Sequence, residues 1–162
     1  DVMRYLMPVL SFMFGVAAAT EIRQHFQNIG RIHWRQIVIL IEMSMLFLVG
    51  FLPGKMDLVA NAFVSFSCAM QVQTFRKVDS YAFASTMCIG NIRSGMEALC
   101  AYRQSHNRQI LYKAFHYFGI IILFAFGAGI GSILIPVFNL QTIWFSSFLL
   151  MVGFFLMFIQ EK

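Results

Sequence analysis

A single carboxyl group stands within an otherwise apolar stretch, residues 36–52, where Glu42 is the only charged side chain. An ionised acidic side chain at the centre of a membrane helix costs roughly 2.5–3.5 kcal/mol on insertion scales. In one interpretation Glu42 is protonated or paired inside a helical bundle, where it serves a proton or cation pathway. In the other it reaches water beside Arg35, about 10 Å away along a helix.

Neutral hydrogen-bonding side chains gather in the part of the sequence that follows. Because such groups rarely face lipid, they either hold helices together or line a polar pocket or pore. Together with Glu42, a glycine and an arginine they form the candidate substrate or ion pathway, which comprises Glu42, Asn61, Gln71, Gln73, Thr86, Gly90, Asn91 and Arg93.

The sequence holds no recognisable catalytic or metal-binding pattern. Its three cysteines lack the paired spacing of a zinc site and the even count of a disulfide framework, and its four histidines lack the i, i+4 spacing of two ligands on one helix. No pairing of a nucleophile with a base is evident either. We therefore predict no catalytic residues, no metal, no cofactor and no enzymatic activity.

The composition indicates a membrane protein. Hydrophobic residues make up 59% of the chain and charged residues only 12%, against about 25% charged in soluble domains. Such a chain cannot cover a globule with polar surface, so it needs lipid as its solvent. The net charge is +5, but the lysines and arginines do not form a basic face interleaved with aromatic residues. This argues against binding of nucleic acid and favours anionic lipid headgroups on the cytoplasmic side as the partner.

Five apolar segments are long enough, or nearly so, to cross a bilayer core, which needs about 20 helical residues. They cover residues 3–22, 36–52, 58–75, 112–135 and 140–159. A turn at Pro136 and Asn139 divides the last two. The sequence therefore predicts an all-α, polytopic transmembrane helical bundle that forms one domain, residues 1–162.

A sixth segment, residues 79–100, is harder to interpret. Its apolar core, residues 81–92, is too short to cross a bilayer yet too apolar for a water-exposed loop. We expect a re-entrant or broken helix, capped by Asp79 or Ser80 and interrupted near Gly90 and Asn91. The alternative is an amphipathic helix lying on the membrane surface.

The basic residues indicate the orientation. If residues 79–100 enter and leave on one side, ten of the twelve lysines and arginines share one face, and only Arg4 and Lys55 lie on the other. Positively charged loops stay in the cytoplasm. The sequence thus predicts a multi-pass membrane protein with a cytoplasmic C-terminus.

Small residues spaced four apart predict close helix packing. Gly127 and Gly131 form a G-x-x-x-G ridge, and Gly15 with Ala19 forms a similar one. Ridges of this kind bring helices of one chain together and also allow a homo-oligomer.

The stretch FVSFSCAMQVQTFRKVDSYAFASTMCIGNIRSGMEAL, residues 63–99, resembles the YoaK-like bacterial inner-membrane proteins, a family defined by a domain of unknown function. The resemblance rests on Gln71, on Arg76 five positions later, on the Thr86-x-x-x-Gly90 turn and on the closing EAL. It extends over the flanking spans. It implies location and architecture rather than an activity.

Members of that family carry an earlier related segment with a Thr-Gly-Asn-type turn. The resemblance therefore implies that this chain, which begins at Asp1 without a methionine, lacks an N-terminal part. Three spans with a re-entrant element would then occur twice, with inverted topology, as in many secondary transporters.

Two functions are compatible with these features. The first is a transporter or permease for a small molecule or ion, and the second is an accessory protein that binds a partner. A transporter should contain a water-accessible cavity that reaches Gln71 and Thr86, whereas an accessory protein should be packed solid there. The sequence identifies neither the substrate nor a coupling ion.

Overall fold

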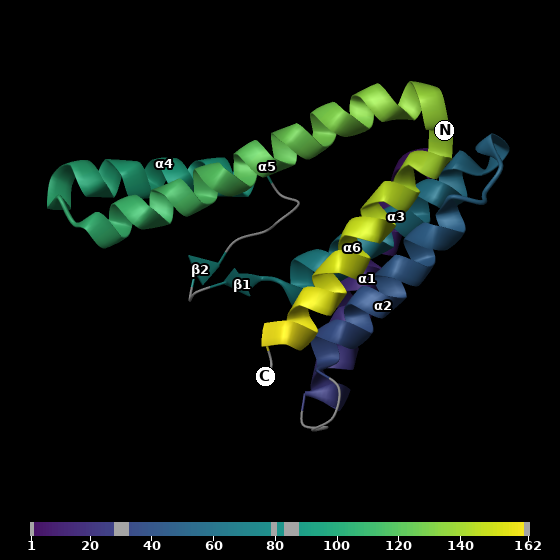
Figure 1. Cartoon of the computed structure of the whole chain (residues 1–162), viewed down its shortest axis with the longest axis horizontal. Helices are drawn as coiled ribbons and strands as arrows, with labels where there is room; N and C mark the ends of the chain where they lie inside the picture. The colour runs from purple at the N-terminus through teal and green to yellow at the C-terminus, as the bar shows by residue number, and fades with distance from the viewer. Residues whose placement is uncertain (1, 28–32, 79–80, 83–87, 161–162) are drawn as a thin grey trace. The chain divides into compact units, whose positions relative to one another are not determined.

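The computed structural model describes residues 2–27, 33–78, 81–82 and 88–160. Apart from one pair of two-residue strands, the regular structure in these residues is helical, which confirms the predicted all-α class (Figure 1). The helices are α1 (Val2–Phe26), α2 (Trp34–Val49), α3 (Asp57–Thr74), α4 (Cys88–Ser105), α5 (Arg108–Phe138) and α6 (Ile143–Gln160), with short 3-10 turns η1 (Gly54–Met56) and η2 (Asn139–Thr142).

The five predicted segments agree with observed helices within a few residues. Helices α1, α2, α3, α5 and α6 correspond, in this order, to the predicted segments 3–22, 36–52, 58–75, 112–135 and 140–159. The turn between the last two helices differs in detail. Pro136 lies inside α5, and the chain reverses at Asn139, whose φ of 50° lies in the left-handed region that asparagine tolerates. Proline has no backbone N–H to donate to the carbonyl one turn earlier, which weakens the helix at this point, and α5 ends two residues later at Phe138.

Two compact units make up the chain, where the sequence analysis expected one domain. The first contains Asp1–Thr74 and Leu134–Lys162, and the second contains Phe75–Ile133. In the first unit α1 packs along α3, while α2 contacts both α3 and α6. Its core includes Ala19, Trp34, Val38 and Met70, all buried.

Small residues allow α1 and α3 to approach closely. A Cβ added to Gly15 would lie 2.5 Å from the carbonyl oxygen of Phe66 and 2.8 Å from the Cβ of Ala69. Ala19, one turn further along α1, is fully buried. Gly15 and Ala19 thus lie where α1 packs on α3, whereas no atom lies within 4 Å of a Cβ added to Gly127 or Gly131 on α5.

The second unit contains α4, most of α5, and strands β1 (Lys77–Val78) and β2 (Tyr81–Ala82), which pair antiparallel. Figure 1 shows α4 lying alongside the first part of α5. Gly95 sits at their contact, where an added Cβ would come within 3.3 Å of Tyr117 and 3.4 Å of Phe118.

The predicted break near Gly90 and Asn91 is wrong, because α4 runs without interruption through both residues to Ser105. A glycine inside a helix costs only about 1 kcal/mol relative to alanine, so a single glycine such as Gly90 does not by itself end a helix. Asp79, Ser80 and Thr86, also assigned to this segment, lie outside the described residues.

Two described stretches are long and apolar enough to cross a membrane, Val2–Phe26 and the run Arg108–Met157 that contains α5 and most of α6. This criterion for a membrane span uses only the length and composition of a helix. It is consistent with membrane association.

Candidate functional site

Glu42 is buried on the face of α2 that packs against other helices. Its side chain is 1% exposed, and its Oε1 has no hydrogen-bond partner among the described residues. The neighbouring positions on this face, Val38, Ile39, Leu46 and Val49, are buried and apolar. Of the two interpretations of Glu42, this burial favours the one in which the carboxyl lies inside a helical bundle.

The carboxyl group opens onto a cavity of about 450 Å³ between α2, α3 and α6. Its polar lining consists of one carboxyl, two hydroxyls, one amide and one thiol, and the rest is aliphatic. The lining residues are Glu42, Leu46, Val64, Ser67, Cys68, Gln71, Ile143, Ser146, Leu149 and Leu150.

The Ser67 hydroxyl is a second polar group in this lining that lacks a hydrogen-bond partner among the described residues. Ser67 is 4% exposed, and its Oγ is buried without a hydrogen-bond partner in the described part of the chain. Buried polar atoms are nearly always paired with protein or ordered water, and unpaired ones need an explanation. Glu42 and Ser67 can therefore both accept a bound water, ion or solute.

Among the described residues, no lysine or arginine lines the cavity. The α6 sequence, Ile143–Gln160, contains no charged residue, and the only charged residue of α3 is Asp57 at its start. On α2 the nearest basic residue is Arg35, whose guanidinium carbon lies 5.6 Å from the centre of the Trp34 ring. Arg23 lies over the same ring at 5.7 Å.

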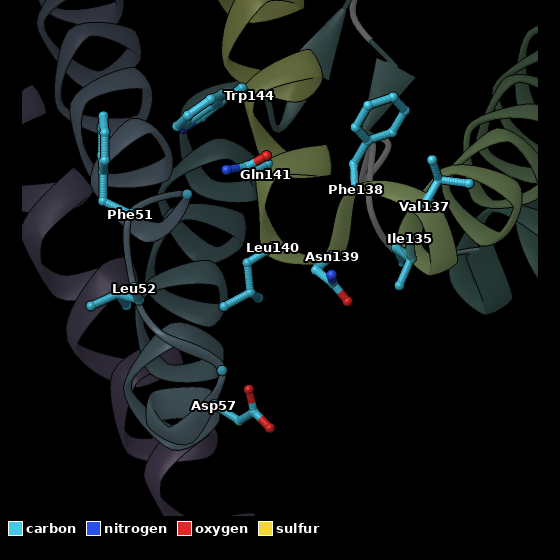
Figure 2. A pocket seen from close by; sticks show the side chains of 12 residues that line it. Phe51, Leu52, Asp57, Ile135, Val137, Phe138, Asn139, Leu140, Gln141 and Trp144 are labelled. Atoms are coloured by element: carbon cyan, nitrogen blue, oxygen red, sulfur yellow. The ribbon is translucent and has the colours of Figure 1, made fainter.

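A larger hollow of about 950 Å³ lies in the same unit, at the connections from α2 to α3 and from α5 to α6. Figure 2 shows Gln141 and Trp144 pointing toward α2, with Asp57 at the lower side of the hollow. Asp57 is the only charged residue in its lining. Gly50 lines this hollow and Leu46 lines the cavity, so about one helical turn of α2 separates the two linings.

Trp144 on α6 packs against α2 beside these hollows. Its indole stacks on Phe47 with a centroid distance of 6.0 Å, and its Nε1 donates a hydrogen bond to the Phe47 carbonyl oxygen at 3.2 Å. The sequence analysis did not identify this residue. The available signal was a tryptophan near the end of an apolar helix, a common position for an interfacial anchor.

The other polar residues predicted on α3 separate into different roles. Gln71 lines the cavity with Glu42. Gln73 instead donates from Nε2 to Thr20 Oγ1 on α1 at 3.1 Å, so it joins two helices. Asn61 is exposed and does not line the cavity.

The predicted residues on α4 belong to the second unit. Gly90 is exposed and surrounded by open space, and Asn91 is buried. Arg93 forms an exposed ion pair with Glu97, with Nε and Oε1 2.8 Å apart. Thr86 lies outside the described residues.

Of the polar residues in this lining, the predicted pathway included Glu42 and Gln71 but not Ser67, Cys68 or Ser146. Cys68 was predictable, since it follows Ser67 and precedes Gln71 at helical spacing on one face. Ser146 was not, because the sequence does not reveal which helix covers Glu42. Within the described residues, no group of three or more His, Cys, Asp or Glu is placed to bind a metal ion.

Residues 1–156 match the family described as "Protein of unknown function (DUF1275)". The search for similar curated proteins and solved structures found no match. The resemblance to the YoaK-like proteins is consistent with the family match. Because the match covers nearly all of the sequence, the chain belongs to the DUF1275 family of proteins of unknown function.

Proposed function

We propose that this protein is a membrane transporter or permease for a small molecule or ion. The observation that carries the proposal is the cavity of about 450 Å³ that contains the buried, unpaired carboxyl oxygen of Glu42. Ionisable groups within membrane helices are costly and commonly mark a path for protons, ions or substrates. A protein whose bundle served only for support would gain stability from an aliphatic residue at this position.

The arrangement of the two hollows supports the same function. One lies at the helix connections beside Asp57, and the other lies about one turn further into the bundle beside Glu42. The first is bordered by the residues that follow α2 and by the starts of α3 and α6, and the second by α2, α3 and α6. In the proposed route a solute passes from the first hollow to the second.

We infer a multi-pass arrangement in which α1, α2, α3, α5 and α6 cross a bacterial inner membrane. Helix α2, with 16 residues, spans about 24 Å, so it needs local thinning of the bilayer or the added length of the turn that follows. The basic residues then put the Lys55 connection outside and the C-terminus in the cytoplasm. The inverted repeat remains a prediction.

The alternative is an accessory protein in which polar groups only hold helices together. The hydrogen bond between Gln73 and Thr20 favours this function, because it is the kind of interhelical contact that such a protein needs. In that case the cavity beside Glu42 would not open to both sides of the membrane.

Cys68 provides a native probe for this difference, because it lines the cavity. With Cys88 and Cys100 changed to serine, membrane vesicles of both orientations are treated with two impermeant methanethiosulfonates, one carrying trimethylammonium and one carrying sulfonate. A transporter should allow at least one reagent to modify Cys68 from each side. A variant with its sole cysteine at Ala60, a buried position on α3 outside the cavity, is the control and should stay unmodified.

Modification of Cys68 from only one side would show a dead-end cavity and would refute transport. Modification no faster than that of the Ala60→Cys control would show a dry bundle and would favour the accessory function.

A further inference from the structure

We propose that the cavity beside Glu42 binds a singly charged organic cation in exchange for the proton that this carboxyl otherwise carries. The inference rests on the proposed function, because it names the class of solute for the same cavity.

The sign of the charge follows from the linings of both hollows. Among the residues that the structure describes, Glu42 is the only charged one lining the cavity and Asp57 the only charged one lining the larger hollow, so neither lining contains lysine or arginine. A carboxylate in a site of low dielectric attracts a cation and repels an anion far more strongly than it would in water. Both steps of the route into the bundle therefore select against anions.

The size of the cavity points to an organic ion rather than a bare metal ion. Its volume of about 450 Å³ falls in the range of ligand pockets, about 300–1,000 Å³, and is many times the roughly 30 Å³ of one water molecule. Aliphatic side chains from all three helices supply the apolar walls, namely Leu46, Val64, Ile143, Leu149 and Leu150. They fit the hydrocarbon part of an ammonium ion.

The polar groups fit the charged part of the same molecule. The side chains of Ser67, Gln71 and Ser146 line the cavity with Glu42, and each has an oxygen that can accept a hydrogen bond or face a cation. A single carboxylate neutralises one positive charge. A dication would leave one charge uncompensated, which is costly in a buried site.

Proton exchange follows from the absence of another counter-charge. An isolated ionised carboxylate in an apolar environment costs so much that the group takes up a proton instead. When the cation arrives, the oxygen–hydrogen bond of the Glu42 carboxyl breaks, the proton leaves to water, and the carboxylate pairs with the cation. Charge is conserved, with one positive charge bound and one released.

Glu42, rather than one of the groups that face it, is the source of the released proton. From α3 the titratable group is the Cys68 thiol, and thiols are in general weaker acids than carboxyl groups. From α6 the lining residues carry no titratable group, and on α2 itself no other charged residue lies in the cavity lining.

The test uses the full chain purified in detergent and benzyltrimethylammonium, a permanent cation that has no proton of its own to release. Binding is measured by calorimetry, and proton release is measured in weakly buffered solution with a pH indicator. We expect about one proton released per cation bound, and an affinity that rises roughly tenfold per pH unit while Glu42 stays protonated in the empty protein. Benzenesulfonate, an aromatic anion of similar size, should not bind.

Variants assign the effect to one carboxyl. Glu42→Gln should release no proton and should bind the cation at least about tenfold more weakly. Glu42→Asp should restore proton release, which guards against a folding defect in the glutamine variant. Glu21→Gln, at an exposed carboxyl on α1, should behave like the unchanged protein.

The results separate this inference from the proposed function. If the cation does not bind between pH 5 and pH 9, or binds to the Glu42→Gln variant as well as to the unchanged protein, the inference is wrong, even where Cys68 reacts from both sides of the membrane. If the cation binds with proton release but Cys68 reacts from one side only, the site stands and transport is refuted.

Discussion

The indole of Trp144 on α6 lies directly against Gly50 at the end of α2, and a Cβ at Gly50 would overlap the ring. The same indole donates to the carbonyl oxygen of Phe47, so moving the ring would also break a hydrogen bond. We therefore predict that Gly50→Ala destabilises the protein by about 1–3 kcal/mol, the usual cost of overpacking. Thermal unfolding in detergent, followed by tryptophan fluorescence, measures the change.

Gly54→Ala is the matched control for Gly50, because open space surrounds Gly54. A melting temperature for Gly50→Ala equal to that of Gly54→Ala would mean that Trp144 does not rest on Gly50.

Gly15 provides a second test of helix packing, in this case between α1 and α3. An added Cβ would meet the carbonyl oxygen of Phe66 at 2.5 Å, and backbone cannot move aside as a side chain can. Gly15→Ala should therefore cost about 1–3 kcal/mol. Gly127→Ala, placed in open space on α5, should not lower stability. Equal melting temperatures for the two variants would contradict the observed packing of α1 on α3.

The positions of five helices could be predicted from the sequence because length and hydropathy are local signals. The continuity of α4 could not. Gly90, Asn91 and Gly95 are typical of a break when taken alone, but α5 covers one face of α4, and Gly95 there allows the close approach of Tyr117. Such a tertiary contact has no signature within the segment itself.

The candidate site was predicted in part for a similar reason. Side chains turn by about 100° per residue along a helix, so Gln71 and Gln73 on one helix point in nearly opposite directions. Polar composition alone grouped them together, whereas the structure assigns one to the cavity and the other to Thr20. Only helical periodicity, applied residue by residue, separates the two roles.

Gly90 tests whether α4 is continuous. It lies inside the helix with nothing near its Cα where a methyl group would go. Because alanine is favoured over glycine in a helix interior by about 1 kcal/mol, Gly90→Ala should raise stability by up to that amount. Amide hydrogen exchange across residues 88–95 should slow in the variant. Faster exchange or a loss of stability would indicate that this position needs the conformational freedom of glycine.

We expect Glu42 to lower the stability of the protein while it enables cation binding. Its side chain is buried, and its Oε1 is unpaired within the described residues, so Glu42→Leu removes an unsatisfied polar group and fills part of a cavity. We expect a gain of about 1–3 kcal/mol in stability, measured by thermal unfolding, together with loss of cation binding. Ile39→Ala, at a buried aliphatic residue on the same helix, is the contrasting case and should be destabilising. Unchanged cation binding by the leucine variant would remove Glu42 from the site.

Gln71 and Gln73 form a matched pair, because the same residue type on the same helix has two different environments. Gln71 faces the cavity, so Gln71→Leu should leave the melting temperature nearly unchanged while it weakens binding of benzyltrimethylammonium severalfold, through loss of an oxygen that faces the cation. Gln73→Leu breaks the hydrogen bond to Thr20 and should cost about 0.6 kcal/mol, the average for such contacts in membrane proteins, with binding preserved. Calorimetric titration and thermal unfolding of both variants give the four values. If both substitutions lowered stability and neither changed binding, Gln71 would be one more contact that holds helices together, and the polar lining of the cavity would have no role in recognition.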